Sequence, residues 1–218
     1  MDFAVKTPGR VRRDRERLMV QELLHGFADV AGEKGEKIFA GIERMDASRL
    51  PWMEAARLLM NRGAGLLLAL ESGDAAFVAR NINKCVLGAG DAFLIAHGLY
   101  RYRAVERASV YEARCGGGLY ASAVQWKFRP EKDPVCDWER ARETWLAAKA
   151  GVCAAADGSV RRRSLASAAR WLVRRRTVGD VSTFALDPVL RILERIAVCV
   201  ESRSAMPADL RRDWEIFN

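Results

Sequence analysis

Apolar and polar residues follow one another along this chain with the period of α-helices. Apolar side chains recur every three or four positions in one segment after another, which places them on one face of a helix. No segment combines strict apolar and polar alternation with a flanking hairpin turn such as Asn-Gly or Asp-Gly, so strands are not expected. The pattern predicts an all-α protein: a helical bundle with two long central helices and additional packed C-terminal helices.

Helix-breaking and helix-capping residues divide this pattern into elements. Pro51 suits a first helical turn, where its missing N–H costs nothing, and Ser72 with Gly73 ends that helix. Asp74 is placed to cap the next one, so the two long helices lie on either side of this break. Further helices are expected over residues 10–31, 37–45, 105–114, 119–128, 137–154, 160–176, 187–202 and 208–216.

The length of the chain, 218 residues, suits one helical domain with appended segments. We divide it into an N-terminal helix over residues 1–36, a bundle core over 37–135, and C-terminal helices over 136–218 that pack on the bundle. The apolar runs are far shorter than the roughly 20 residues needed to span a bilayer, and charges occupy the region where a secretory signal is apolar. We therefore expect a cytoplasmic protein with no membrane partner.

The second long helix carries charged residues although much of its surface is apolar. Its charged and small residues share a sector of about 80° at 100° per residue, although two large apolar residues interrupt it. In the first long helix, Asn61 and Arg62 precede Gly63 and Gly65, and we expect these glycines to face glycines of the second helix. The residues of the sector, here called the polar stripe, are Arg80, Lys84, Gly88, Asp91 and Gly98.

Two interpretations of the polar stripe follow. Lys84 and Asp91 are about 10 Å apart along the helix axis, too far for a direct pair, so each needs another partner. In the first interpretation, Arg62 and Asp91 form a buried ion pair between the two helices, and Lys84 reaches solvent along its aliphatic stem. In the second, Arg62, Arg80 and Lys84 line a cleft that holds phosphate groups, and Asp91 fixes one of these cations. The sequence favours pairing.

Three runs of the sequence, LLMNRGAGLLLAL, NKCVLGAGDAFLIAHGLYRYR and YASAVQWKFRPEKD, resemble a known family. They resemble the helical domain that follows the catalytic domain in nucleotidyltransferase-fold proteins, a domain related to the pairing of minimal nucleotidyltransferases with HEPN proteins. The resemblance covers residues 37–133. It implies a helical bundle whose second long helix carries a lysine and an acidic residue, as Lys84 and Asp91 do here.

Catalytic motifs of that superfamily are not found in this sequence. The nucleotidyltransferase site needs a Gly-Ser turn shortly followed by paired aspartates, which hold divalent metal and nucleotide phosphates, and no Asp-x-Asp or Asp-x-Glu in this sequence has a Gly-Ser shortly before it. HEPN ribonucleases place an arginine before a histidine with four to six residues between them, and neither His25 nor His97 has such an arginine. We therefore expect no catalytic residues in this chain by itself.

The resemblance implies a binding role. We expect a noncatalytic domain that binds a nucleotide or substrate phosphate, or that docks a partner, through Arg62, Arg80, Lys84 and Asp91. If the chain is part of an enzyme, that enzyme is a nucleotidyltransferase. The implied partner is a separate nucleotidyltransferase chain, and the implied cofactor is a nucleotide with Mg²⁺.

The formal net charge of +8 favours an acidic partner and supports an alternative function. Two arginine triplets flank an apolar centre in SVRRRSLASAARWLVRRRTVG, and a nucleic-acid surface gains affinity from such cations through counterion release. Projected on a helix, however, the arginines scatter around it, as on a solvated helix with basic ends. They are Arg161, Arg162, Arg163, Arg174, Arg175 and Arg176.

The cysteines and histidines point away from a metal site. The chain has five cysteines without a Cys-x-x-Cys pair, and two histidines. An odd number of widely spaced cysteines disfavours both a disulfide framework and a zinc site. We expect the cysteines to be reduced and mostly packed.

Overall fold

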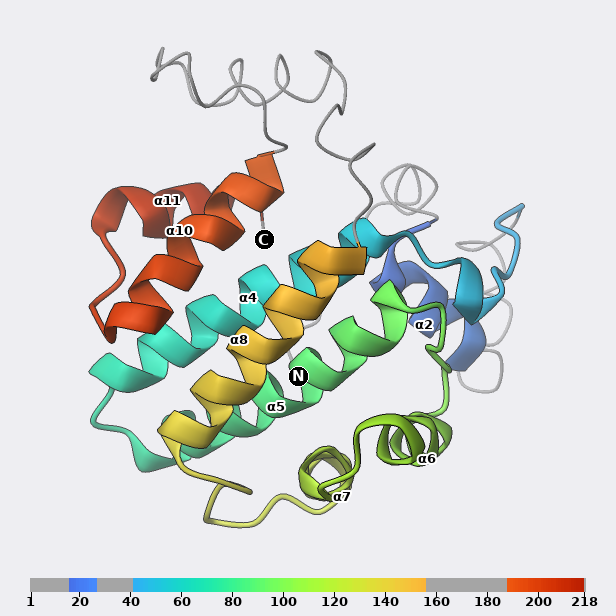
Figure 1. The fold of residues 1–218 in the computed structure, drawn as a ribbon, viewed down its shortest axis with the longest axis horizontal. Coiled ribbons are helices and arrows are strands. Elements are labelled where there is room, and N and C mark those ends of the chain that lie inside the picture. The colour runs from blue at the N-terminus through green and yellow to red at the C-terminus, as the bar shows by residue number, and fades with distance from the viewer. Residues whose placement is uncertain (1–15, 27–40, 156–187, 218) are drawn as a thin grey trace.

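The computed structural model describes residues 16–26, 41–155 and 188–217 of the chain. Within these ranges the chain forms eight α-helices and one 3₁₀-helix, and no strand (Figure 1). The prediction of an all-α helical bundle is confirmed. None of the described helices is long and apolar enough to cross a membrane.

Two long helices form the centre of the bundle, as predicted. Helix α4 (Trp52–Glu71) and helix α5 (Ala75–Ala96) follow one another after a short turn and pack along their length. Helix α8 (Trp138–Ala155) lies against both, and helix α10 (Pro188–Ser202) lies along α4 (Figure 1). One core of buried apolar side chains runs from Ala47 to Leu210 through all of these helices. The described part of residues 136–218 therefore shares its core with the central pair.

The ends of the central helices follow from local chemistry. Pro51 is the N-cap residue of α4 and Ser72 is its C-cap residue. The side chain of Asp74 accepts hydrogen bonds from the backbone N–H groups of Ala76 and Phe77, at 2.9 and 3.2 Å, which satisfies donors that a helix N-terminus leaves open. Gly98, with φ +65°, follows the end of α5 in the left-handed conformation that glycine adopts most readily.

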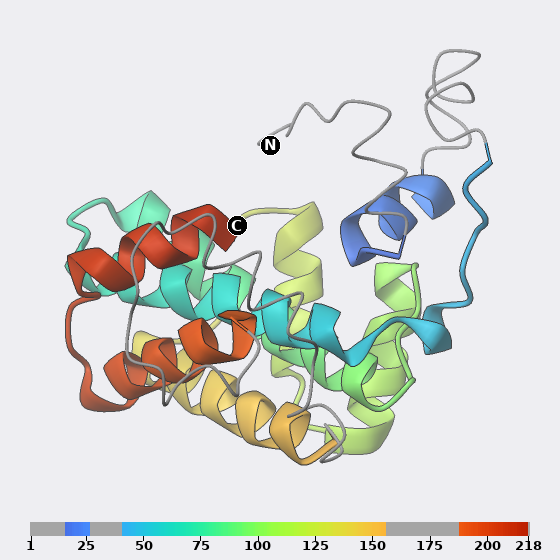
Figure 2. The same cartoon turned by 90° about the horizontal axis from the view of Figure 1, so that it is seen from above.

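The remaining helices cover the two ends of the central pair. Helix α6 (Ala104–Cys115) and helix α7 (Leu119–Phe128) are seen end-on in Figure 1 and lengthwise in Figure 2, and they run across α5, which both contact. Helix α2 (Leu18–Gly26) lies at one end of the bundle, and α10 with α11 (Ala208–Phe217) lies at the other (Figure 2).

Some predicted elements differ from the structure. Residues 41–45, the described part of the helix expected over 37–45, are not helical, and the 3₁₀-helix η1 (Ala47–Arg49) comes next instead. Asp46 accounts for this turn, because its side chain accepts the N–H of Ser48 at 2.8 Å and favours a local cap over a continued helix. The helix expected over 160–176 lies outside the described residues, and of the one over 10–31 only α2 is described.

Two tryptophans seven positions apart fasten α8 to α4. The indole N–H of Trp145 donates to the carbonyl of Leu59 at 2.9 Å, and that of Trp138 donates to the carbonyl of Leu66 at 3.0 Å. Trp145 is fully buried, and a Cβ on Gly63 would lie only 2.6 Å from its ring. A glycine at position 63 therefore makes room for this contact between the helices.

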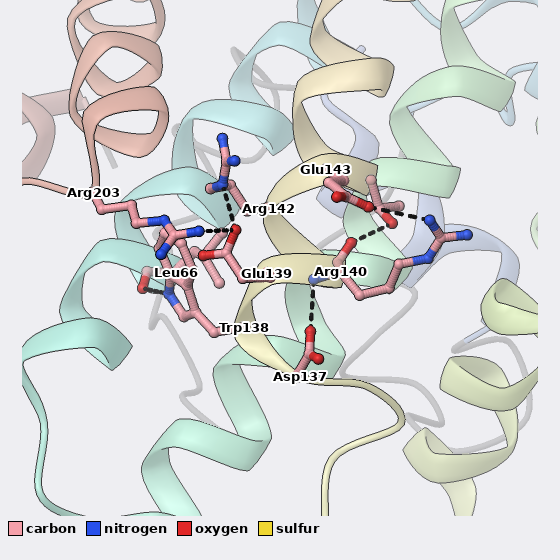
Figure 3. A network of polar contacts seen from close by, with 9 residues as sticks. Leu66, Asp137, Trp138, Glu139, Arg140, Arg142, Glu143 and Arg203 are labelled. Carbon is pink, nitrogen blue, oxygen red and sulfur yellow. Dashed lines mark hydrogen bonds and ion pairs between the residues drawn. The ribbon is translucent and has the colours of Figure 1, made fainter.

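Charged groups at the start of α8 join it to the end of α10 (Figure 3). The carboxylate of Glu139 lies 3.1 Å from the guanidinium of Arg142 on the same helix and 2.6 Å from that of Arg203. Asp137 accepts the backbone N–H of Arg140 at 2.7 Å and caps the helix. Glu139 and Arg203 are exposed and Arg142 is partly exposed, so we assign them a positioning role with a small effect on stability.

Candidate functional site

The four residues predicted to bind phosphate separate into an inner and an outer pair. Asp91 is buried and Arg62 is partly buried, whereas Arg80 and Lys84 are exposed. The guanidinium of Arg80 lies over the ring of Phe77 on its own helix, 5.6 Å from the ring centroid. Neighbouring helices cover the polar stripe around Gly88 and Asp91 and leave its first two turns open.

Asp91 pairs with Arg107 of α6. The Nε atom of Arg107 lies 2.9 Å from Oδ1 of Asp91, and the hydroxyl of Tyr120 on α7 donates to the same oxygen at 2.5 Å. The predicted ion pair between Arg62 and Asp91 is therefore wrong. The partner of Asp91 comes from α6, which crosses α5, and not from the preceding helix α4.

Arg107 is itself almost completely buried, with 1% of its side chain exposed. Its Nη1 donates to the carbonyls of Arg101 and Tyr102, at 2.8 and 3.0 Å, and its guanidinium lies over the ring of Tyr100, 4.7 Å from the centroid. Burial lowers the pKa of Arg107, but the nearby carboxylate of Asp91 raises it further, so the pKa stays above its usual value and the group stays charged. Burial raises the pKa of Asp91, and Arg107 and Tyr120 oppose this change.

A second carboxylate reaches this cluster from α2. Tyr100 donates its hydroxyl to Oε1 of Glu22 at 2.5 Å, and Nη1 of Arg107 lies 3.6 Å from the same oxygen. Burial and the two nearby carboxylates, Asp91 and Glu22, raise the pKa of the Tyr100 hydroxyl, so it remains a hydrogen-bond donor. Glu22 thus ties the N-terminal helix to the centre of the bundle.

Arg62 lies beside this cluster without an ion pair of its own among the described residues. Its aliphatic stem packs against Gly88, where a Cβ would overlap the Arg62 side chain. Its Nε is buried and has no hydrogen-bond acceptor within the described part of the chain. Burial lowers the pKa of Arg62, while Cys85, Asp91 and Glu22 act in the other direction. The guanidinium remains charged at neutral pH.

The glycines of the central helices face side chains rather than other glycines. Gly88 faces Arg62, Gly65 faces the amide of Asn81, and Gly90 lies under the ring of Tyr120. The expectation that glycines of α4 face glycines of α5 is therefore wrong. The missing Cβ atoms admit the side chains that build the polar cluster.

Asn83, also on α5, anchors the segment between α7 and α8. Its side chain is buried, donates to the carbonyl of Ala79 at 2.8 Å and accepts the N–H of Val135 at 2.9 Å. It thereby fixes the segment between α7 and α8. A shallow hollow of about 680 Å³ lies along this segment, lined among others by Trp126, Arg129 and Asp133.

The structure also shows where His97 lies and whether the described side chains form a metal-binding group. His97 is exposed at the C-cap of α5, where its ring lies against Phe93. Residues 16–26, 41–155 and 188–217 contain no group of three or more His, Cys, Asp or Glu side chains arranged to hold a metal. The arginines proposed to bind nucleic acid, residues 161–163 and 174–176, lie outside the described ranges.

Comparison of the chain with known protein families, with curated proteins and with solved structures finds no match.

Proposed function

We propose that this chain is a noncatalytic helical binding domain, similar to the one that accompanies nucleotidyltransferases, and that Arg62 binds a phosphate group of a nucleotide or substrate. The observation that carries this proposal is the partly buried guanidinium of Arg62, whose Nε has no acceptor among the described residues. A buried N–H donor without an acceptor is unfavourable, the more so when it belongs to a charged group. An anion supplied by a ligand would relieve this.

The Nε of Arg107 also lacks a hydrogen bond among the described residues, but Arg107 and other partly or fully buried arginines lie within ion-pair distance of carboxylates, whereas no described carboxylate lies within that distance of Arg62. Arg57 lies 2.5 Å from Glu54, Arg107 lies 2.9 Å from Asp91, and Arg142 lies 3.1 Å from Glu139. The guanidinium is suited to a phosphate because its planar donors match two phosphate oxygens. The unsatisfied N–H donor of Arg62 is therefore of the kind to which a phosphate oxygen binds.

Lys84 and Arg80 extend the positive charge along α5. Lys84 precedes Gly88, on which Arg62 packs, by four residues, and Arg80 precedes Lys84 by four more. Residues at this spacing lie on one face, about 6 Å apart along the helix. Both are exposed, so they would attract an anion toward Arg62 through the long-range field rather than hold it tightly.

A catalytic partner chain remains part of the proposal. The resemblance implies that a separate nucleotidyltransferase chain supplies the metal-binding aspartates, and a nucleotide with Mg²⁺ would then be shared between the two chains. Nucleic-acid binding rests on arginines outside the described residues. Phosphate binding at Arg62 is the function that the described geometry supports best.

Calorimetric titration of the full chain with inorganic phosphate, and with ATP in the presence and absence of Mg²⁺, tests the proposal. The variant Arg62→Met keeps an unbranched stem against Gly88 and removes the charge. We expect it to weaken binding at least about tenfold, the loss of one charge-assisted contact. Arg212→Met, on the exposed face of α11, is the matched control. Equal binding by wild type and Arg62→Met, or none by wild type, contradicts the proposal.

A further inference from the structure

The carboxylate of Glu22 lies in a site built from cationic and hydroxyl donors of three other elements. Tyr100, just after α5, donates its hydroxyl at 2.5 Å, and Arg107 of α6 contributes Nη1 at 3.6 Å. Arg62 of α4 lies beside the same cluster, because its side chain packs on Gly88, three residues before Asp91. Convergent donors of this kind bind carboxylates and phosphates alike. Glu22 is the anion that the chain itself places there.

The charges of this cluster balance only because Glu22 is present. Two guanidinium groups, Arg62 and Arg107, face two carboxylates, Asp91 and Glu22. Asp91 is held by Arg107 and Tyr120 and is 8% exposed, so it cannot leave without exposing a buried charge. The side chain of Glu22 is 41% exposed. Of the two carboxylates, Glu22 is the one that solvent and a competing anion can reach.

Helix α2, which carries Glu22, is joined to the bundle largely by polar contacts. The Gln21 side chain pairs with the backbone of residues 43 and 45, at 3.2 and 2.8 Å, and the N–H of Leu18 donates to Glu54 at 3.0 Å. Its buried apolar residues, Val20 and Leu24, form a small cluster with Ile42 that is separate from the main core. Hydrogen bonds of this kind can be exchanged for hydrogen bonds to water. Leu18 packs against the main core and the His25 ring stacks on Tyr102, so release of α2 would disturb the main core only at its edge.

We infer that Glu22 competes internally for the phosphate site, so that a phosphate entering beside Arg62 displaces the Glu22 carboxylate from Tyr100 and Arg107 and loosens α2 from the bundle. This assignment rests on the proposed function of Arg62. The incoming anion replaces the charge that leaves, and a phosphate offers more acceptor oxygens than a carboxylate does. In the resting chain Glu22 keeps the site neutral and lowers its apparent affinity for ligand.

Two measurements on the full chain test this competition. The first is calorimetric titration with inorganic phosphate of wild type and of Glu22→Gln, which keeps the shape of the side chain and removes its charge. We expect Glu22→Gln to bind phosphate about tenfold more tightly, because the internal competitor is gone. Glu43→Gln, an exposed residue that leads toward the 3₁₀-helix, removes the same charge nearby and should leave the affinity unchanged. The double variant Glu22→Gln/Arg62→Met should lose this tighter binding.

The second measurement is hydrogen exchange of the backbone amides of α2 with and without phosphate. In wild type, saturating phosphate should accelerate exchange in α2 and leave α4 and α5 protected. If Glu22 had only a structural role, the Glu22→Gln variant would be less stable than wild type but would bind phosphate with the same affinity.

The outcomes separate this inference from the proposed function. Arg62-dependent binding that is equal in wild type and Glu22→Gln, or that leaves α2 exchange unchanged, overturns the competition alone. Binding by Glu22→Gln but not by wild type supports the competition and overturns phosphate binding by the resting chain. No binding by either protein overturns both.

Discussion

Arg107 of α6 places its Nε 2.9 Å from Oδ1 of Asp91 on α5, and both side chains are buried. This contact explains why a largely apolar helix carries an aspartate. The charge of Asp91 is neutralised by a cation from a crossing helix and by the hydroxyl of Tyr120, so α5, α6 and α7 are joined at one carboxylate. The pair fixes the relative position of three helices, which is a structural role distinct from the ligand-binding role that we propose for Arg62.

Asp91→Asn should destabilise the fold strongly. The substitution leaves the guanidinium of Arg107, 1% exposed, without its carboxylate, and breaking one partner of a buried pair lowers the free energy of unfolding by about 3–5 kcal/mol. Urea denaturation followed by circular dichroism measures the loss. Glu143→Gln, which removes an exposed partner of Arg140, is the control and should change stability by less than about 1 kcal/mol.

A double variant makes this prediction sharper. Adding Arg107→Met to Asp91→Asn removes the stranded charge, so the double variant should be less destabilised than the sum of the two single ones. Additive losses would show that the two residues act independently and that the contact has little energetic weight.

Local signals in the sequence were sufficient for most of the described helices but not for the partners of Asp91. Helix α7 begins and ends where predicted, because a run of glycines precedes Leu119 and a proline follows Arg129. The periodicity also indicated that Asp91 lies on a face shared with small residues. Arg101, Arg103 and Arg107 follow within one short stretch, however, and only the packing of α6 across α5 decides that Arg107 turns inward.

The sequence contains only a weak indication of where the Tyr120 ring packs. Gly90 precedes Asp91, and its missing Cβ admits the ring of Tyr120. A glycine in a helix indicates that something approaches closely but not what does. Glu22 had no signal, because a charged residue on an amphipathic helix is ordinarily solvated.

Gly88→Ala should have opposite effects in two backgrounds. In wild type a Cβ at position 88 overlaps the stem of Arg62 and lies 3.0 Å from its Nε, so we expect a loss of about 1–3 kcal/mol in spite of the better helix propensity of alanine. In an Arg62→Ala background the overlap is gone, and Gly88→Ala should be neutral or stabilising. Thermal unfolding of the four proteins checks the sign. A similar loss in both backgrounds would mean that another neighbour limits the space at Gly88.

The cysteines should differ widely in their reactivity toward iodoacetamide. Burial raises the pKa of Cys136 to about 11, so only about one thiol in a thousand is ionised at pH 8, and the thiolate is the reactive form. Below that pKa each unit of pH should raise the alkylation rate of Cys136 about tenfold. Cys115 is exposed and should react first, whereas Cys85, which is buried and whose pKa burial raises further, should react only on unfolding. Mass spectrometry of quenched samples gives the order, and early labelling of Cys85 would contradict the packing of α5 against α8.

Gly63→Ala should separate α8 and α10 from α4. A Cβ at this position would lie 2.6 Å from both the Trp145 ring and the Ile196 side chain, and the Trp145 indole is held in place by its hydrogen bond to Leu59 at 2.9 Å. Because two neighbours on different helices are blocked at once, a loss of about 1–3 kcal/mol is expected in urea unfolding. Gly73→Ala, in the turn between α4 and α5 with open space around it, is the matched control and should be nearly neutral. Trp145→Phe should recover only part of the loss, since Ile196 still meets the added methyl group. Full recovery would assign the whole constraint to α8, and no loss at all would mean that α4 and α8 lie further apart than described.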